Sequence, residues 1–183
     1  MADLLPFLTS LISLRDPHAS GHSHHVEDLA YTLGQQVDLP SEQLSLLGFA
    51  ARIHDIGKIA INEFIINKPG RFTEAEYIMV QQHSLLGSRL VEKLDLDPNI
   101  PEIILNHHEN FDGTGYPNGA KGEDIPLGAR IIRITDTYDA LTSNRGYRSA
   151  YTHHEAVQIM EKEQCFFDPQ LLDVFLKMEH YKQ

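Results

Sequence analysis

The chain has 183 residues, 42% of them hydrophobic and 22% charged, which fits one globular domain with its own core. Its formal net charge is -11 at pH 7, so the chain as a whole is poorly suited to bind DNA or an anionic membrane surface. A single cysteine, Cys165, excludes an internal disulfide and a zinc site built from several cysteines.

The first predicted element is a short apolar helix at the N-terminus. Its hydrophobic stripe consists of Leu4, Leu8, Leu11 and Ile12. Pro6 interrupts this stripe early, and no basic segment precedes it, so we expect neither a signal peptide nor a membrane span, and we expect a cytoplasmic location. We expect residues 1–14 to form an N-terminal helix or connector and residues 15–183 to form the domain. The stripe then belongs to a connection with a sensory or receiver module, contacts a second copy of the chain, as in a homodimer, or packs on its own domain.

Helical spacing continues along most of the chain, and start signals precede most of the helices. These signals are Asp16-Pro17, Pro40-Ser41, the capping boxes Thr73–Glu76 and Thr152–Glu155, and Asp168-Pro169. Two further helices are predicted at residues 98–109 and 127–141. Strand-like alternation is nearly absent, so the sequence predicts an all-α, single-domain fold.

Two stretches break the helical pattern. INEFIINKPGRF (residues 61–72) is predicted to be a loop with a Pro-Gly turn. NFDGTGYPNGAKGEDIPLG (residues 110–128) has five glycines and two prolines, too many for a helix. A loop of that length is unusual as a passive connector in a compact domain, which indicates a functional role.

Candidate metal ligands stand at or near the ends of apolar helical stretches. They are His22, His54-Asp55, His83, His107-His108 and Asp136. Buried imidazoles and carboxylates are costly unless they are paired or metal-bound. Five histidines and two aspartates exceed what one ion needs and suit a pair of first-row metals, about 3.5–4 Å apart, with one carboxylate bridging. A set of unrelated core and surface histidines is the competing interpretation, and the two adjacent doublets argue against it.

These segments resemble a known family. HDIGK at residues 54–58 resembles the signature of the HD phosphohydrolase superfamily, and HHENFDGTGYP at residues 107–117 resembles the second signature of its HD-GYP subfamily. Further stretches match the same family in the same order: RDPHASGHSHHV, NKPGRFTEAE, IPLGARIIRITDTYDALTSNRGYRSA and FDP. The HD doublet alone is weakly diagnostic, whereas the doublet together with the GYP loop is highly specific.

The resemblance implies a helical bundle of the HD-domain type with a long GYP loop and a site for two or three divalent ions. The family's usual metals are iron or manganese; zinc, nickel and cobalt are alternatives. Its usual activity is hydrolysis of cyclic di-GMP by a metal-bound hydroxide, first to pGpG and then in part to GMP, and some members act on cyclic GMP-AMP. By resemblance, all seven candidate ligands occupy metal-ligand positions, and Asp55 bridges.

The histidine-rich segment at residues 18–25 then resolves into different roles. His22 lies on the apolar stripe of its helix and matches the first ligand of the family. His18 precedes it by one helical turn, where members with a third metal carry a glutamate. A neutral imidazole at residue 18 is also able to ligate a metal, but it offsets no charge of a third dication, which favours two metals. His24 falls on the polar face, and His25 is expected near the groove.

Other residues are expected to contact substrate or support the site. Lys58, four residues after His54, is our candidate for the phosphate contact and for charge stabilisation in the transition state; a solvated lysine at a helix end is the alternative. Asp139 either orients a ligand histidine or Lys58, or lies on the helix surface. Tyr116 in the GYP loop is expected to stack on a guanine or to cover the pocket.

Arg145 and Arg148 match the phosphate-binding cations of the family; two exposed arginines are the alternative. The family's RPYR is RGYR here, and Ser149 stands where many members have a basic residue. We expect both departures to weaken binding of the phosphate that is not cleaved.

Three functions compete. The first is a phosphodiesterase for cyclic di-GMP, the second is a catalytically weak receptor for the nucleotide or a protein partner, and the third is a nucleotidase acting on mononucleotides. The intact ligand set favours the first over the second, and the GYP loop disfavours the third. By resemblance, the GYP loop is also expected to contact a diguanylate cyclase of the GGDEF type.

Overall fold

The computed structural model describes residues 4–16, 19–144 and 149–178, and within these ranges it contains helices and loops but no β-strand. The α-helices are α1 (Leu4–Arg15), α2 (Ala19–Gln36), α3 (Ser41–Ile53), α4 (Glu63–Ile66), α5 (Glu74–Val91), α6 (Asn99–Asn106), α7 (Leu127–Thr142), α8 (His153–Lys162) and α9 (Pro169–Lys177). Short 3-10 helices are η1 (Ile56–Ala60), η2 (Gly122–Asp124) and η3 (Gln164–Phe166). The prediction of an all-α, single-domain fold is confirmed.

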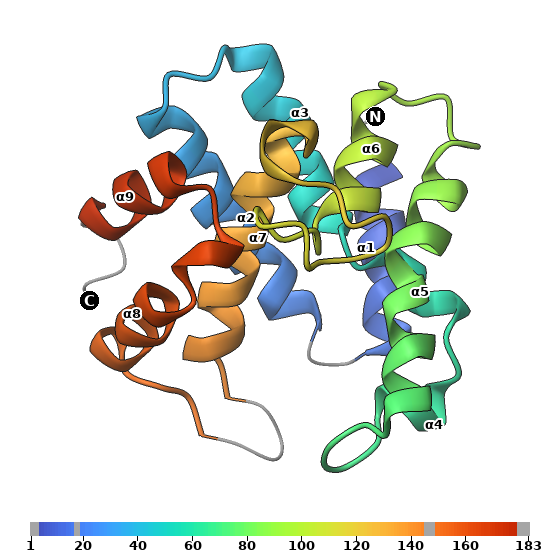
Figure 1. The fold of residues 1–183 in the computed structure, drawn as a ribbon. Coiled ribbons are helices and arrows are strands. Elements are labelled where there is room, and N and C mark those ends of the chain that lie inside the picture. Colours follow the sequence, from blue (N-terminus) through green and yellow to red (C-terminus); the bar gives the residue numbers. More distant parts are fainter. Residues whose placement is uncertain (1–3, 17–18, 145–148, 179–183) are drawn as a thin grey trace.

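One hydrophobic core joins these helices. α2 packs against α3 and α7, and α5 packs against α6 and η1. Figure 1 shows α7 in the middle of the bundle, with α5 on one side and α8 and α9 on the other, while the loop between α6 and α7 crosses the front. Fully buried residues of the core come from helices far apart in the sequence, among them Val26, Ile53, Ile104 and Ile131. The core therefore fixes the ends of α2, α3, α5, α6 and α7 relative to one another.

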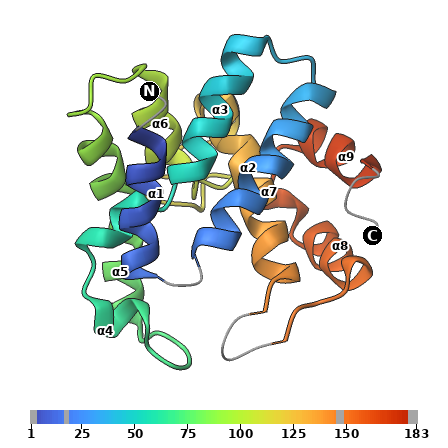
Figure 2. The same cartoon turned by 180° about the vertical axis from the view of Figure 1, so that it is seen from behind.

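Helix α1 lies on the face that is turned toward the viewer in Figure 2, where it contacts α2, α3 and η1. Leu8 and Ile12 are each 2% exposed and belong to the core, whereas Leu14 is 83% exposed. Pro6 does not break this helix, because it lies in the first turn, where a backbone N–H has no helical partner. The boundary between residues 1–14 and 15–183 stays a prediction. Within the described residues, no helix combines the length and apolar character needed to cross a membrane.

Several start signals are confirmed by side-chain caps. Thr73 and Thr152 form the predicted capping boxes with Glu76 and Glu155, and Asp168 accepts hydrogen bonds from the first backbone N–H groups of α9. The prediction for Pro40-Ser41 was wrong in one respect. Residue 40 occupies the N-cap and makes no side-chain cap, so α3 begins at Ser41 without one. Pro17 lies outside the described residues.

Two predicted boundaries were wrong. Residues 61–72 are not wholly a loop, because α4 forms one helical turn in which the Asn62 side chain accepts a hydrogen bond from the Phe64 N–H at 2.9 Å. The predicted helix at residues 98–109 ends earlier, at Asn106. His107 then occupies the C-cap of α6 and still has helical dihedral angles, and the chain turns after it toward the GYP loop.

Gly57 determines how closely η1 approaches α5. A Cβ at residue 57 would overlap the carbonyl oxygen of His83 and the backbone nitrogen of Gly87. We expect Gly57→Ala to lower the free energy of unfolding by about 3 kcal/mol or more, because backbone atoms cannot give way as a side chain does. Chemical denaturation measures this. Gly21→Ala is the matched control, since a Cβ at residue 21 would meet no atom within 4 Å, and it should be neutral or stabilising. Equal effects of the two variants would contradict the close contact.

Candidate metal centre

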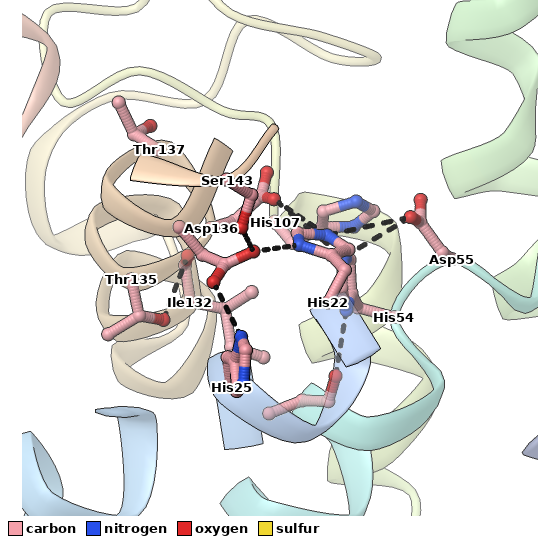
Figure 3. Close-up of polar contacts among 12 residues, drawn as sticks. His22, His25, His54, Asp55, His107, Ile132, Thr135, Asp136, Thr137 and Ser143 are labelled. Atoms are coloured by element: carbon pink, nitrogen blue, oxygen red, sulfur yellow. Dashed lines mark hydrogen bonds and ion pairs between the residues drawn. The ribbon is translucent and has the colours of Figure 1, made fainter. Parts of the chain in front are cut away.

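Seven candidate ligands, predicted from five separate segments, meet in one place. His22 is on α2, His54 and Asp55 join α3 to η1, His83 is on α5, His107 and His108 follow α6, and Asp136 is on α7. Figure 3 shows the part of this cluster where α2, α7 and the end of α3 meet, with His22 between Asp136 and Asp55. Three sets have ligand atoms within 4.8 Å of one another: His83, His107 and His108; His22, His54 and Asp136; and His54, Asp55 and His107.

Backbone carbonyls fix the orientation of three of these rings. In each case the ring Nδ1 lies near the carbonyl three residues earlier: His54 to Ala51 at 2.7 Å, His83 to Val80 at 2.6 Å, and His107 to Ile104 at 2.6 Å. A carbonyl only accepts, so Nδ1 carries the proton and the lone pair of Nε2 faces the cluster. Local helix geometry therefore prepares three imidazoles as ligands.

The same geometry tests whether the residues fit a metal. Nε2 of His83 and Nε2 of His107 lie 3.2 Å apart, although both lack a proton when their Nδ1 atoms donate to carbonyls. Two lone pairs at that distance repel, and a cation held by both nitrogens removes the repulsion. Oxygens of Asp55 extend the set, at 3.4 Å from His83 Nε2 and 3.5 Å from His54 Nε2. The donor set of imidazole nitrogens and carboxylate oxygens fits first-row divalent metals.

Burial keeps most of the imidazoles neutral. Burial, together with the neighbouring histidines, lowers the pKa of His107 to about 3 and also lowers the pKa values of His83 and His108. Burial alone would raise the pKa of Asp55, but Lys58 and the surrounding histidines hold that pKa well below its usual value. Neutral imidazoles beside an ionised carboxylate are the protonation states that metal binding requires.

His22 differs from the other ligands because carboxylates surround it. Its Nδ1 lies 2.6 Å from Asp139 Oδ2 and its Nε2 lies 3.2 Å from Asp136 Oδ1. Burial would lower the pKa of His22, but hydrogen bonds to Asp136 and Asp139 outweigh it and raise the pKa to about 10. Asp139 is 4% exposed, so it orients a candidate ligand rather than lying on the helix surface.

The remaining histidines of α2 lie outside the cluster. Nδ1 of His25 is 3.2 Å from the other oxygen of Asp139, and its side chain is 65% exposed (Figure 3). The His24 side chain is 57% exposed. His18, Arg145 and Arg148 lie outside the described residues, so their roles stay predictions.

Lys58 lies beside the cluster rather than in solvent. Its Nζ donates a hydrogen bond to Asp55 Oδ2 at 2.6 Å, and the side chain is 22% exposed. Burial would lower the pKa of Lys58, but the Asp55 carboxylate raises it, so the ammonium stays charged. The positive charge is thus held next to the proposed bridging carboxylate.

The GYP loop folds back onto the histidine doublet. The Tyr116 N–H donates to the His108 carbonyl at 3.2 Å, and the two rings stack with centroids 4.8 Å apart. Gly115 permits this approach, because a Cβ there would overlap the backbone nitrogen of Asn110. Tyr116 therefore covers one face of a candidate ligand. Its ring also meets Tyr77 of α5 edge to face, at 6.4 Å between centroids.

Glu109 has a role that the sequence reasoning missed. It directly follows the histidine doublet and is 1% exposed, and its Oε1 accepts hydrogen bonds from the N–H groups of Asn118 at 2.7 Å and Gly119 at 3.1 Å. Its Oε2 is buried without a hydrogen-bond partner in the described part of the chain. An acidic residue directly after the histidine doublet was the available signal, and its partners became visible only in the folded loop.

We expect Glu109→Ala to lower the free energy of unfolding by about 1–3 kcal/mol, because two hydrogen bonds to a charged acceptor are lost. Chemical denaturation measures this change. Glu123→Ala, an exposed residue of the same loop, is the control and should leave stability within about 0.5 kcal/mol of the parent. A Glu109→Ala variant as stable as the control would show that the carboxylate does not secure the loop.

The chain is similar to known proteins over most of its length. A family profile described as HD domain matches residues 6–171. The chain is 38% identical over 173 residues to a cyclic di-GMP phosphodiesterase of Pseudomonas aeruginosa, covering 93% of this chain and 42% of that protein. It is 36% identical over 152 residues to the 3'3'-cGAMP-specific phosphodiesterase 3 of Vibrio cholerae, covering 83% of this chain and 33% of that protein. The chain thus spans less than half the length of these curated relatives.

A solved structure of an HDG"Y"P protein from Bdellovibrio bacteriovorus has the same fold. Its TM-score is 0.71 at 23% sequence identity, and the match covers 86% of this chain and 51% of that one. At this level of identity the match supports the helical architecture alone. The helical bundle is therefore an arrangement known from experiment.

Proposed function

The chain belongs to the HD domain family, and on that basis we propose that it is a metal-dependent phosphodiesterase that hydrolyses cyclic di-GMP to pGpG and in part to GMP. The names of the relatives in Pseudomonas and Vibrio support a cyclic dinucleotide as the substrate class. The observation that carries the proposal is the convergence of imidazole nitrogens and carboxylate oxygens from five segments on one largely buried cluster.

We propose two divalent ions, iron or manganese, with zinc, nickel or cobalt as alternatives. One ion would be held by His83, His107, His108 and Asp55, and the other by His22, His54, Asp136 and Asp55. The oxygens of Asp55 support a bridging role, because Oδ1 faces His83 and Oδ2 faces His54 and His22, at 3.4, 3.5 and 3.9 Å. His18 remains our candidate for contact with a third ion.

When bound, such ions supply a nucleophile near neutral pH and neutralise charge on the phosphoryl oxygens. The chain's own residues position the substrate. The ammonium of Lys58 is held at the cluster and is able to contact a phosphate oxygen as negative charge develops there. Arg145 and Arg148 are proposed to hold the second phosphate. Such local cations matter because the net charge of -11 otherwise repels an anionic substrate.

Product analysis tests this function. Reduced protein loaded with iron or manganese is incubated with cyclic di-GMP and, separately, with cyclic GMP-AMP, and the products are separated by chromatography. We expect pGpG, followed by some GMP, from cyclic di-GMP. Tight binding of cyclic di-GMP without any pGpG would overturn the proposal and favour a receptor. Faster turnover of cyclic GMP-AMP would instead indicate that this chain prefers the substrate named for the Vibrio relative.

The protein partners and the cellular location are also proposals. We propose that the GYP loop contacts a GGDEF-type diguanylate cyclase, and that the exposed side of α1 mediates a homodimer. Phe7 and Leu14 are 58% and 83% exposed on that helix, which supports a contact surface there. We propose a cytoplasmic location and no binding to DNA or to a membrane, on the grounds of charge and composition.

A further inference from the structure

We propose that Arg133 is a specificity-determining residue that binds the acceptor edge of a guanine base, next to a face formed by Tyr116 and Tyr77. The inference rests on the proposed function, since it concerns how that same site recognises a cyclic dinucleotide. Neither Arg133 nor Tyr77 is among the site residues that the sequence motifs predict. The support comes from how the guanidinium is held and from what surrounds it.

Arg133 is anchored through two of the three nitrogens of its guanidinium. It lies on α7, one turn before Asp136, and its Nε donates to Asn110 Oδ1 at 2.9 Å, while its Nη1 donates to Thr137 Oγ1 at 2.6 Å. The guanidinium carbon lies 5.5 Å from the centre of the Phe167 ring. These contacts hold the planar group in one orientation, so little conformational entropy would be lost on binding a ligand.

The anchoring contacts leave donors unused. A guanidinium has five N–H groups, and the two hydrogen bonds described use one each on Nε and Nη1. Nη2 makes no hydrogen bond to any described residue, and it is not fully enclosed by the protein. Arg133 as a whole is half-buried, so Nη2 keeps its N–H groups for a ligand, and beside it Nη1 keeps a second N–H.

The charges around Arg133 place it at the edge of the metal centre. Burial lowers the pKa of Arg133, while the nearby Asp136 carboxylate and the Tyr116 and Tyr77 hydroxyls raise it. Arg133 also helps to lower the pKa of His108. An arginine remains charged even when partly desolvated, and a desolvated charge forms stronger hydrogen bonds than one in water. The open donors thus lie within electrostatic range of the ligands Asp136 and His108.

Two aromatic rings complete the surface. Tyr116 lies against His108 on one side, and Tyr77 meets Tyr116 edge to face and is 49% exposed. The exposed ring of Tyr77 and the half-buried ring of Tyr116 are able to stack on a nucleobase. The rings tolerate any base, because every base has a π-face, so discrimination must come from hydrogen bonds.

The donor pattern of Arg133 selects guanine. Guanine presents two acceptors, N7 and O6, on one edge, whereas adenine presents N7 beside an amino donor. An arginine has only donors, so it matches guanine and opposes the adenine amino group. A good pair of this kind contributes about 1–3 kcal/mol of discrimination against the wrong base, which is roughly 5- to 150-fold.

The test compares substrates within each variant. The ratio of kcat/KM for cyclic di-GMP to kcat/KM for cyclic di-AMP is measured for the parent, Arg133→Met and Arg133→Lys in the metal-loaded protein. Methionine keeps an unbranched chain against Phe167, and lysine keeps the charge without the planar fork. We expect the ratio to fall about tenfold or more in Arg133→Met and by less in Arg133→Lys, because the lysine ammonium also has only donors but lacks the planar fork. Thr137→Val, which removes an anchor of Nη1 but keeps the guanidinium, should retain most of the ratio.

The outcomes separate this inference from the proposed function. If the parent does not cleave cyclic di-GMP, the proposed function fails, and the inference is then tested by the binding of mononucleotides. GMP should bind the parent more tightly than AMP, and Arg133→Met should lose that preference in equilibrium titrations. If the parent cleaves cyclic di-GMP but both variants keep its ratio within twofold, the inference alone is overturned. Equal losses on both substrates would also overturn it, because they indicate an arginine that only supports the loop or binds phosphate.

Discussion

Asp55→Ala is expected to remove bound metal and to lower turnover of cyclic di-GMP by about a thousandfold or more, because several kcal/mol of charge stabilisation are lost with the ions. Asp55 is 3% exposed, and its oxygens face His83 on one side and His54 and His22 on the other. Without Asp55, the proposed site of His83, His107 and His108 loses the carboxylate that offsets the positive charge of an ion. Elemental analysis of the purified variant and its rate with cyclic di-GMP measure both effects.

A second variant separates metal loss from unfolding. Removing Asp55 also leaves the Lys58 ammonium without its carboxylate, and an unpaired buried charge typically costs about 3–5 kcal/mol. Asp55→Asn with Lys58→Met removes both charges and restores electrical balance, so it should fold while still failing to load metal. Asp28→Ala, an exposed residue of α2, should load metal and turn over normally. Near-normal activity of Asp55→Ala would contradict the two-metal arrangement.

The family and the fold were both predictable from the sequence for physical reasons. The HD domain profile over residues 6–171 confirms the resemblance drawn from HDIGK and the GYP segment. Apolar spacing and capping boxes act over three or four residues, so the helix starts capped by Thr73 and Thr152 were predicted correctly. The one-turn helix α4 escaped prediction, because a single turn is too short to show periodicity.

The candidate ligands were also visible in the sequence, and the structure brings all seven together. What the sequence did not show were the residues that depend on how the GYP loop returns. Glu109, Tyr77 and Arg133 have no local pattern that reveals their partners, because Asn118, Tyr116 and Asn110 lie 9, 39 and 23 residues away. Such contacts follow from the path of the loop, which propensity and spacing do not specify.

His22 of the metal-free protein carries a proton that a bound ion must displace. His22 lies between Asp139 and Asp136, and their hydrogen bonds raise its pKa to about 10 against the opposing effect of burial. His83, His107 and His108 have lowered pKa values and are neutral at pH 7, so they have no proton to release there. The raised pKa of His22 stabilises the metal-free fold fully below pH 6.5, and this contribution is lost as the pH rises through about 10.

As the pH rises, metal affinity should increase, whereas the contribution of protonated His22 to the stability of the metal-free fold decreases. Because the ion needs the unprotonated ring, we expect the association constant for Mn²⁺ to rise about tenfold per pH unit above pH 7, with about one proton released per chain by His22. Calorimetric titrations in two buffers with different ionisation enthalpies count the protons. Asp139→Asn removes one of the carboxylates that raise the pKa, so it should release fewer protons at pH 7.5 while keeping the ligand itself. If neither the parent nor Asp139→Asn releases a proton on binding Mn²⁺, His22 is already neutral before metal binds, and the carboxylate pair serves only to orient its ring.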